Sequence, residues 1–121
     1  MEIFKIKSSD KQTELSCQMW KPEGEPKVIL QIVHGMCEYI GRYADFAEFL
    51  TKEGVLVVGD DHLGHGNSAN GNFGYFGEND GWKMLIEDEC ILAKTMQEQY
   101  PGIPYVLLGH SMGSFIARKL L

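Results

Sequence analysis

The sequence predicts an α/β fold, in which a β-hairpin precedes a parallel sheet covered by helices. Mostly apolar runs at residues 28–33, 55–60 and 104–109 alternate with longer segments whose apolar residues recur at helical spacing. Strands that alternate with helices form βαβ units with right-handed crossovers, which produce a parallel sheet. At the start of the chain, residues 2–7 and 12–20 are β-prone and are joined by a polar turn, which is typical of an antiparallel hairpin.

The first parallel strand is predicted at residues 28–33. This run is almost continuously apolar, as in a strand buried on both faces, and it follows a loop at residues 22–26 that contains two prolines and a glycine. Helical periodicity then begins at Tyr39, and Gly54 ends the helix before the strand at 55–60. One face of this helix carries its apolar residues, Tyr39, Tyr43, Phe46, Ala47 and Leu50.

A second helical segment is predicted between residues 82 and 100. Asn79 or Asp80 is suited to cap its start, and a Pro-Gly pair at 101–102 ends it. The strand at 104–109 follows, and a further helix continues from Ser114. The Gly- and Asn-rich stretch at 60–81 is long for a connection in a compact domain, which indicates a functional loop or a short element.

Composition limits the class of protein. The 121 residues, 44% of them hydrophobic, fit one domain. Seventeen acidic and 11 basic residues give a net charge of −6, so neither nucleic acid nor an anionic membrane surface is an expected partner. We expect no transmembrane segment and no secretory signal. The three cysteines are widely spaced, which argues against a disulfide framework or a thiolate metal site and favours a cytoplasmic location.

Residues 109–113 form a Gly-x-Ser-x-Gly motif directly after the last predicted strand. In a nucleophile elbow, a serine on a sharp turn between strand and helix projects its hydroxyl, and flanking glycines relieve the steric crowding. The motif therefore predicts Ser111 as a catalytic nucleophile, supported by Gly109 and Gly113.

Three blocks together resemble the α/β-hydrolase fold, at residues 33–43, 61–68 and 109–113. Within that fold they are similar to the group of monoacylglycerol lipases, lysophospholipases and serine aminopeptidases S33, and the likeness runs from about residue 28 onward. It implies a serine hydrolase that cleaves a small ester, such as a monoacylglycerol or lysophospholipid, through an acyl-enzyme without a cofactor. It also implies that the backbone N–H groups of Met36 and Met112 form the oxyanion hole, with His34 and Gly35 as supporting residues of the motif.

The other polar residues have plainer interpretations. His34 is expected to shape the turn before Met36, and His110 to make a packing or local hydrogen-bond contact, since adjacent residues diverge at an elbow. His62 and His65 are expected to stabilise a loop, and no metal site is predicted. For Asp60, Asp61 and Asp88 we expect helix capping, loop hydrogen bonds or solvation. The aromatic residues Phe73, Tyr75 and Phe76 either face an acyl chain or pack the loop.

The triad order that accompanies such an elbow is serine, then an acid, then histidine. Only ten residues follow Ser111, and none is Asp, Glu or His. We therefore expect residues 1–121 to be the N-terminal portion of an α/β-hydrolase domain, cut within the helix after the elbow and inactive alone. The sheet should be incomplete, with an open strand edge through which the chain continues or associates. Two alternatives remain: a non-catalytic binding protein of this fold, and a serine aminopeptidase.

Overall fold

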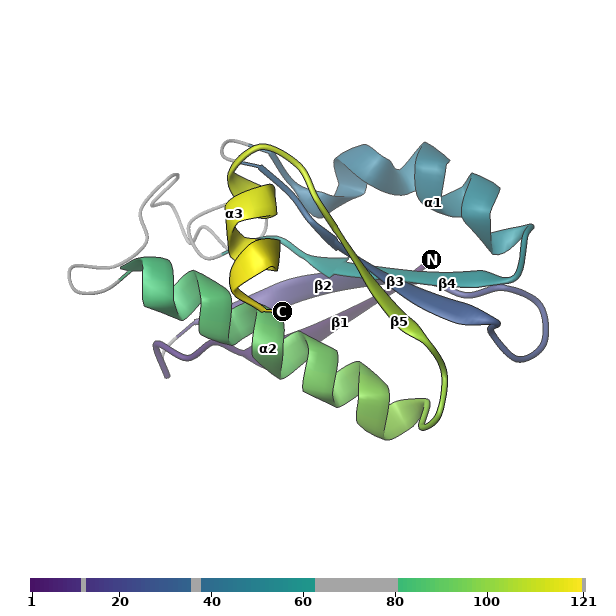
Figure 1. Ribbon diagram of the computed structural model, residues 1–121, viewed down its shortest axis with the longest axis horizontal. Helices are drawn as coiled ribbons and strands as arrows, with labels where there is room; N and C mark the ends of the chain where they lie inside the picture. Colours follow the sequence, from purple (N-terminus) through teal and green to yellow (C-terminus); the bar gives the residue numbers. More distant parts are fainter. Residues whose placement is uncertain (12, 36–37, 63–80, 121) are drawn as a thin grey trace.

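The structure is a computed structural model that describes residues 1–11, 13–35, 38–62 and 81–120. A five-stranded sheet in the order β1-β2-β4-β3-β5 runs through the molecule (Figure 1). The hairpin strands β1 (Glu2–Lys7) and β2 (Glu14–Trp20) are antiparallel, as predicted, and β2 is antiparallel to β4. The remaining neighbours, β3 (Val28–Val33), β4 (Val55–Asp60) and β5 (Tyr105–Gly109), are parallel. The predicted fold class is confirmed, and the sheet does not close on itself.

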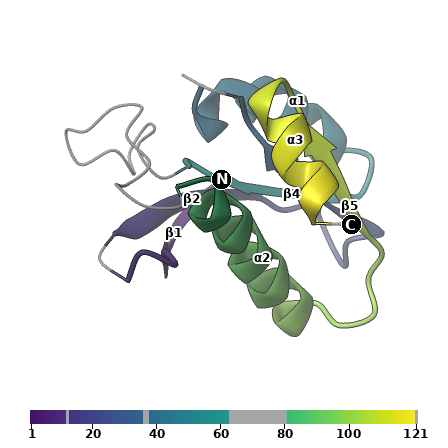
Figure 2. The same cartoon turned by 60° about the vertical axis from the view of Figure 1, so that its left-hand side comes forward.

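Helices lie on both faces of the sheet (Figures 1 and 2). The short 3₁₀ helix η1 (Ile40–Tyr43) leads directly into α1 (Ala44–Thr51), where the sequence predicts one continuous helix. On the opposite face lie α2 (Gly81–Gln99) and α3 (Met112–Lys119). The predicted caps of α2 lie outside the described residues, as do His65 and the three loop aromatics.

The core has two sides because side chains alternate along each strand. Val57 and Ile32 point toward η1 and α1, where they pack with Ile40 and Ala47. The alternate residues of the same strands face α2 and α3 in two clusters. One contains Cys17, Met19, Ile29, Leu56, Val58, Leu92 and Met96, and the other contains Leu15, Val33, Leu85 and Ile116.

The parallel register brings the carboxyl ends of β3, β4 and β5 to one edge of the sheet. Val33 is the partner of Gly109, and Ile32 is the partner of Gly59. In open α/β sheets, ligands bind beyond the carboxyl ends of the strands. The residues that follow these three strands are therefore the candidates for a functional site.

Candidate functional site

The turn between β5 and α3 holds Ser111 in a conformation that few residues adopt. Ser111 has φ 55° and ψ −121°, and it is one of two non-glycine residues with positive φ in the described chain. A side chain at positive φ is sterically strained, and such strain occurs where a fold aims a functional group. Ser111 is exposed, and α3 begins at the next residue. This is the backbone geometry of the elbow that the motif predicts.

The two glycines of the motif leave no space for a side chain. A Cβ atom on Gly113 would lie 1.9 Å from the carbonyl oxygen of Val33, and one on Gly109 would lie 2.5 Å from the carbonyl oxygen of Gly113. Both neighbours are backbone atoms, which cannot rotate away. The absence of side chains thus allows α3 to pack directly against β3 and β5.

The loop after β3 lies against the same turn. A Cβ atom on Gly35 would lie 3.2 Å from Cβ of Ser111 and 3.1 Å from the carbonyl oxygen of His110. The predicted oxyanion donor Met36 lies outside the described residues, whereas Met112 is the first residue of α3. Its backbone N–H is therefore at a helix N-terminus, where the macrodipole favours negative charge.

Glu38 is a residue of this site that the sequence did not single out. It is 9% exposed, and its Oε1 accepts hydrogen bonds from the backbone N–H of Gly35 at 2.5 Å and from the Tyr43 hydroxyl at 3.0 Å. The Nδ1 atom of His110 lies 3.3 Å from the same oxygen, and Arg42 lies 3.3 Å from Oε2. Glu38 therefore ties the loop after β3 to the residue before Ser111.

Several groups stabilise the charge on Glu38. Burial alone would raise its pKa, but the hydrogen bonds from Gly35 and Tyr43 and the neighbouring His110 ring hold the pKa of this carboxyl below its ordinary value. Burial and the Glu38 carboxylate together raise the pKa of Tyr43 to about 12. At neutral pH the contact is thus a carboxylate that accepts from a neutral phenol.

His34 and His62 stack at the ends of β3 and β4, with ring centroids 3.7 Å apart. Nε2 of His34 accepts from the backbone N–H of His62 at 3.0 Å, so the proton of the neutral ring lies on Nδ1, which donates to the carbonyl oxygen of Gly35 at 2.7 Å. Both ring nitrogens are engaged, so His34 offers no free base. It contacts the turn that it is predicted to shape.

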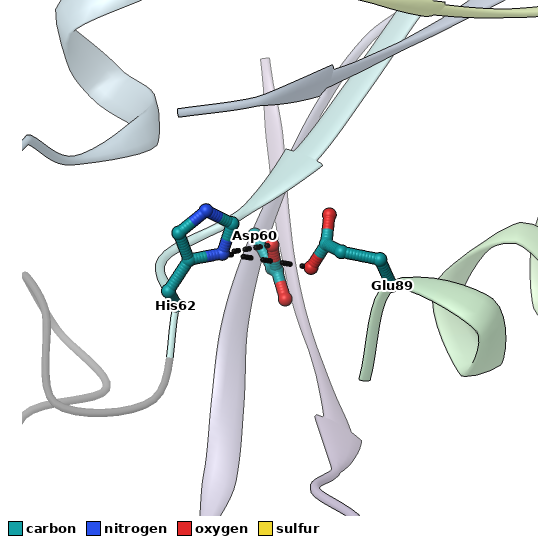
Figure 3. Close-up of side chains that lie close together, drawn as sticks. All are labelled: Asp60, His62 and Glu89. Carbon is teal, nitrogen blue, oxygen red and sulfur yellow. Dashed lines mark ion pairs between the residues drawn. The ribbon is translucent and has the colours of Figure 1, made fainter. Parts of the chain in front are cut away.

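A second polar cluster, formed by Asp60, His62 and Glu89, is buried under α2 (Figure 3). Burial would lower the pKa of His62, but Asp60 and Glu89 raise it well above its ordinary value. Burial and the charge of Asp60 raise the pKa of Glu89 well above normal. The pKa of Asp60 is lowered in spite of burial, because His62 lies beside it.

The three aspartates differ from one another in role. Asp61 accepts from the backbone N–H of Ile40 at 2.7 Å, and Asp88 accepts from Ser8 and Ser9, in agreement with the predicted loop hydrogen bonds. For Asp60 the prediction of capping, loop hydrogen bonds or solvation is wrong. Its side chain is fully buried, and no hydrogen bond to its carboxylate is found within the described residues.

The model of the family described as serine aminopeptidase, S33, matches residues 24–121, which is most of the chain. The chain belongs to the serine aminopeptidase S33 family. The predicted membership of the α/β hydrolases is thereby confirmed. The matched residues include β3, β4, β5 and Ser111.

Several proteins similar to this S33 chain are named lipases or esterases. Human monoglyceride lipase is 38% identical over 110 residues, which cover 85% of this chain and 33% of the relative. A monoglyceride lipase homolog of monkeypox virus is 39% identical over 108 residues, 84% of this chain and 35% of the relative. A thermostable carboxyl esterase from Bacillus coagulans, solved in complex with glycerol, superposes with a TM-score of 0.92 at 37% identity, over 98% of this chain and 39% of that one.

The chain thus spans about a third of the length of these two monoglyceride lipase relatives. Among the helices that the structure describes, none has the length and apolar character needed to cross a membrane.

Proposed function

We propose that the whole protein hydrolyses small, lipid-like carboxylic esters, with monoacylglycerols and lysophospholipids as the substrate class. The observation that carries the proposal is the strained, exposed Ser111 at the carboxyl end of β5, in contact range of the loop after β3. The similarity to monoglyceride lipases and to a carboxyl esterase supports an ester as the substrate.

In the proposed reaction, the Ser111 hydroxyl oxygen attacks the ester carbonyl while its proton passes to a base. The negative charge that develops on the carbonyl oxygen is stabilised by the backbone N–H groups of Met36 and Met112. Collapse of the tetrahedral intermediate expels the alcohol, which takes up the proton and leaves an acyl-enzyme. Water then attacks the acyl group, and the fatty acid and free Ser111 are released.

The base in this reaction comes from outside the described residues. His34 and His62 use their Nε2 atoms in buried hydrogen bonds, and the His110 ring lies beside Glu38. No hydrogen bond to the hydroxyl of Ser111 is found in the described part of the chain. We therefore propose that residues 1–121 are a partial hydrolase domain, whose histidine and acid are supplied by the remainder of the whole protein.

The first prediction concerns Ser111. In the whole protein, Ser111→Ala should lower kcat for a monoacylglycerol by at least about 10³-fold, because the acyl-enzyme does not form. Thr51→Ala is the matched control, since it removes an exposed hydroxyl at the end of α1 and should leave kcat unchanged. Hydrolysis is measured by fatty acid release, and labelling with a fluorophosphonate probe reports on Ser111 directly.

The second candidate function, suggested by the description of the matching family, is release of N-terminal residues from peptides. Both reactions use the same acyl chemistry, so a substrate comparison separates them. We expect kcat/KM for a monoacylglycerol to exceed that for an aminoacyl amide. A higher value for the amide would contradict the ester proposal, and ligand binding without turnover of either substrate would indicate a non-catalytic binding protein.

Two further properties belong to the proposal. We place the whole protein in the cytoplasm, on the basis of the widely spaced cysteines of this chain. We also propose that the 121-residue chain, when isolated, associates through β5, which is the edge strand of the described sheet and pairs on one side only, with β3.

A further inference from the structure

The buried cluster under α2 joins three side chains from two distant segments. Asp60 is the last residue of β4, His62 follows two residues later, and Glu89 comes from α2 (Figure 3). Their exposed fractions are 0%, 1% and 0%. Nδ1 of His62 lies 3.4 Å from Oδ1 of Asp60 and 3.6 Å from Oε2 of Glu89. One donor atom from each residue lies within 4.8 Å of the other two.

Surrounding groups hold two of these side chains in place. Oε1 of Glu89 accepts a hydrogen bond from Nε2 of Gln31 at 3.1 Å, and the Tyr105 hydroxyl donates to Oε1 of Gln31. This arrangement directs the other carboxylate oxygen of Glu89 toward His62. Because Nε2 of His62 donates to the carbonyl oxygen of His34 at 2.8 Å, the neutral ring presents the lone pair of Nδ1 to both carboxylates.

The carboxylate oxygens that face His62 lack hydrogen-bond donors among the described residues. Both carboxylate oxygens of Asp60 and Oε2 of Glu89 are fully buried and accept no hydrogen bond from the described residues. Buried charges of this kind occur where they are paired or where they coordinate a metal ion. Without an ion, a proton on His62 and a proton on Glu89 balance the cluster, and a divalent ion would replace both protons.

We propose that Asp60, His62 Nδ1 and Glu89 Oε2 bind one divalent metal ion, with Zn²⁺ as the best match. Ligand atoms about 2.1 Å from zinc in a tetrahedron are separated by about 3.4 Å, close to the two distances from Nδ1 of His62. One imidazole and two carboxylates suit zinc, and their charges balance the ion. The second ring nitrogen of His62, Nε2, donates a hydrogen bond to a backbone carbonyl oxygen. Zinc-bound histidines commonly make such a hydrogen bond.

The ion would connect the carboxyl end of β4 to the middle of α2. The sequence analysis predicted no metal site and expected His62 and His65 to stabilise a loop. The proposed ligands instead include Asp60 and Glu89, which come together only through packing of α2 on the sheet.

The test is zinc binding by the whole protein after removal of metal with a chelator. We expect one equivalent of Zn²⁺ by calorimetry, retention of this equivalent through gel filtration, and a higher midpoint of thermal unfolding. Asp60→Asn and Glu89→Gln should each weaken the Kd for zinc at least about tenfold. Asp88→Asn is the matched control, because it neutralises the adjacent buried carboxylate of α2, and its Kd should equal that of the unsubstituted protein.

A Co²⁺ spectrum of the unsubstituted protein gives an independent readout if a variant does not fold. Intense visible absorption indicates that Co²⁺ is coordinated tetrahedrally, as expected for the buried ligands. Weak absorption, which is typical of octahedral Co²⁺, would contradict the proposed site. The proposal is overturned if the metal-free protein, after zinc has been added, retains no zinc through gel filtration. In that case the cluster holds protons only. It is equally overturned if both variants bind zinc as tightly as the unsubstituted protein.

Discussion

At the scale of single residues, the turn at Ser111 depends on glycines. Backbone atoms of neighbouring segments come close together at these glycines because no side chain separates them. The positive φ of Ser111 is strained, and the surrounding contacts must maintain it. Gly113 contributes because its Cα faces the carbonyl oxygen of Val33, and Glu38 contributes because its carboxylate joins Gly35 to His110. The conformation of one serine is thus supported by both neighbouring strand ends.

Substitution of Gly113 tests this dependence. Gly113→Ala places a Cβ 1.9 Å from a backbone oxygen, so α3 must shift, and we expect the free energy of unfolding to fall by about 3 kcal/mol or more. The matched control is Gly41→Ala, whose nearest contact would be an ordinary 3.5 Å, and it should change stability by less than about 1 kcal/mol. Urea unfolding measures both, and equal losses would contradict the steric explanation.

At the scale of elements, Asp88 connects α2 to the turn between β1 and β2 through hydrogen bonds. Its carboxylate accepts from the Ser8 hydroxyl at 2.9 Å and from the backbone N–H of Ser9 at 2.7 Å, and the Ser9 hydroxyl donates to the carbonyl oxygen of Met84 at 3.2 Å. Burial, which outweighs these hydrogen bonds, raises the pKa of Asp88 to about 6. The charged form is therefore costly in the folded state.

The pH dependence of this contact has a defined sign. Because the pKa of Asp88 is higher in the folded state than in the unfolded chain, its contribution to stability is complete below about pH 4 and is lost as the pH rises through 6. Asp88→Asn removes this titration. The stability of the variant relative to the unsubstituted protein should rise between pH 4 and 6, by at most about 1.4 kcal/mol per pH unit. Urea unfolding across this range measures it, and a flat difference would contradict the raised pKa.

At the scale of the whole molecule, the sheet of the described residues has β5 at one edge. Val106 and Leu108 on this strand are 47% and 37% exposed, so the edge strand presents apolar side chains to solvent. A hollow of about 720 Å³ lies beside the same strand, between α2 and α3. An unpaired apolar edge of this kind is a template for further pairing.

We expect the average mass of the isolated 121-residue chain to increase with concentration, as measured by analytical ultracentrifugation. Val106→Lys combined with Leu108→Lys should reduce this association, because charged side chains at an edge oppose pairing. Phe49→Lys is the control, since Phe49 is an exposed apolar residue of α1 away from the edge, 60% exposed. A chain that stays monomeric at every concentration would contradict the proposal.

By itself, the sequence determined the elements and the family. Apolar runs and helical periodicity predicted β3 and β4 at their observed bounds, and the Gly-x-Ser-x-Gly pattern predicted a turn at Ser111, because these signals lie within a few neighbouring residues. The tertiary structure alone decided the position of β4 between β2 and β3, the contact of Glu38 with His110, and the meeting of Asp60 with Glu89. These contacts join segments that lie far apart in the chain. They depend on how the helices pack on the sheet, which no local sequence pattern predicts.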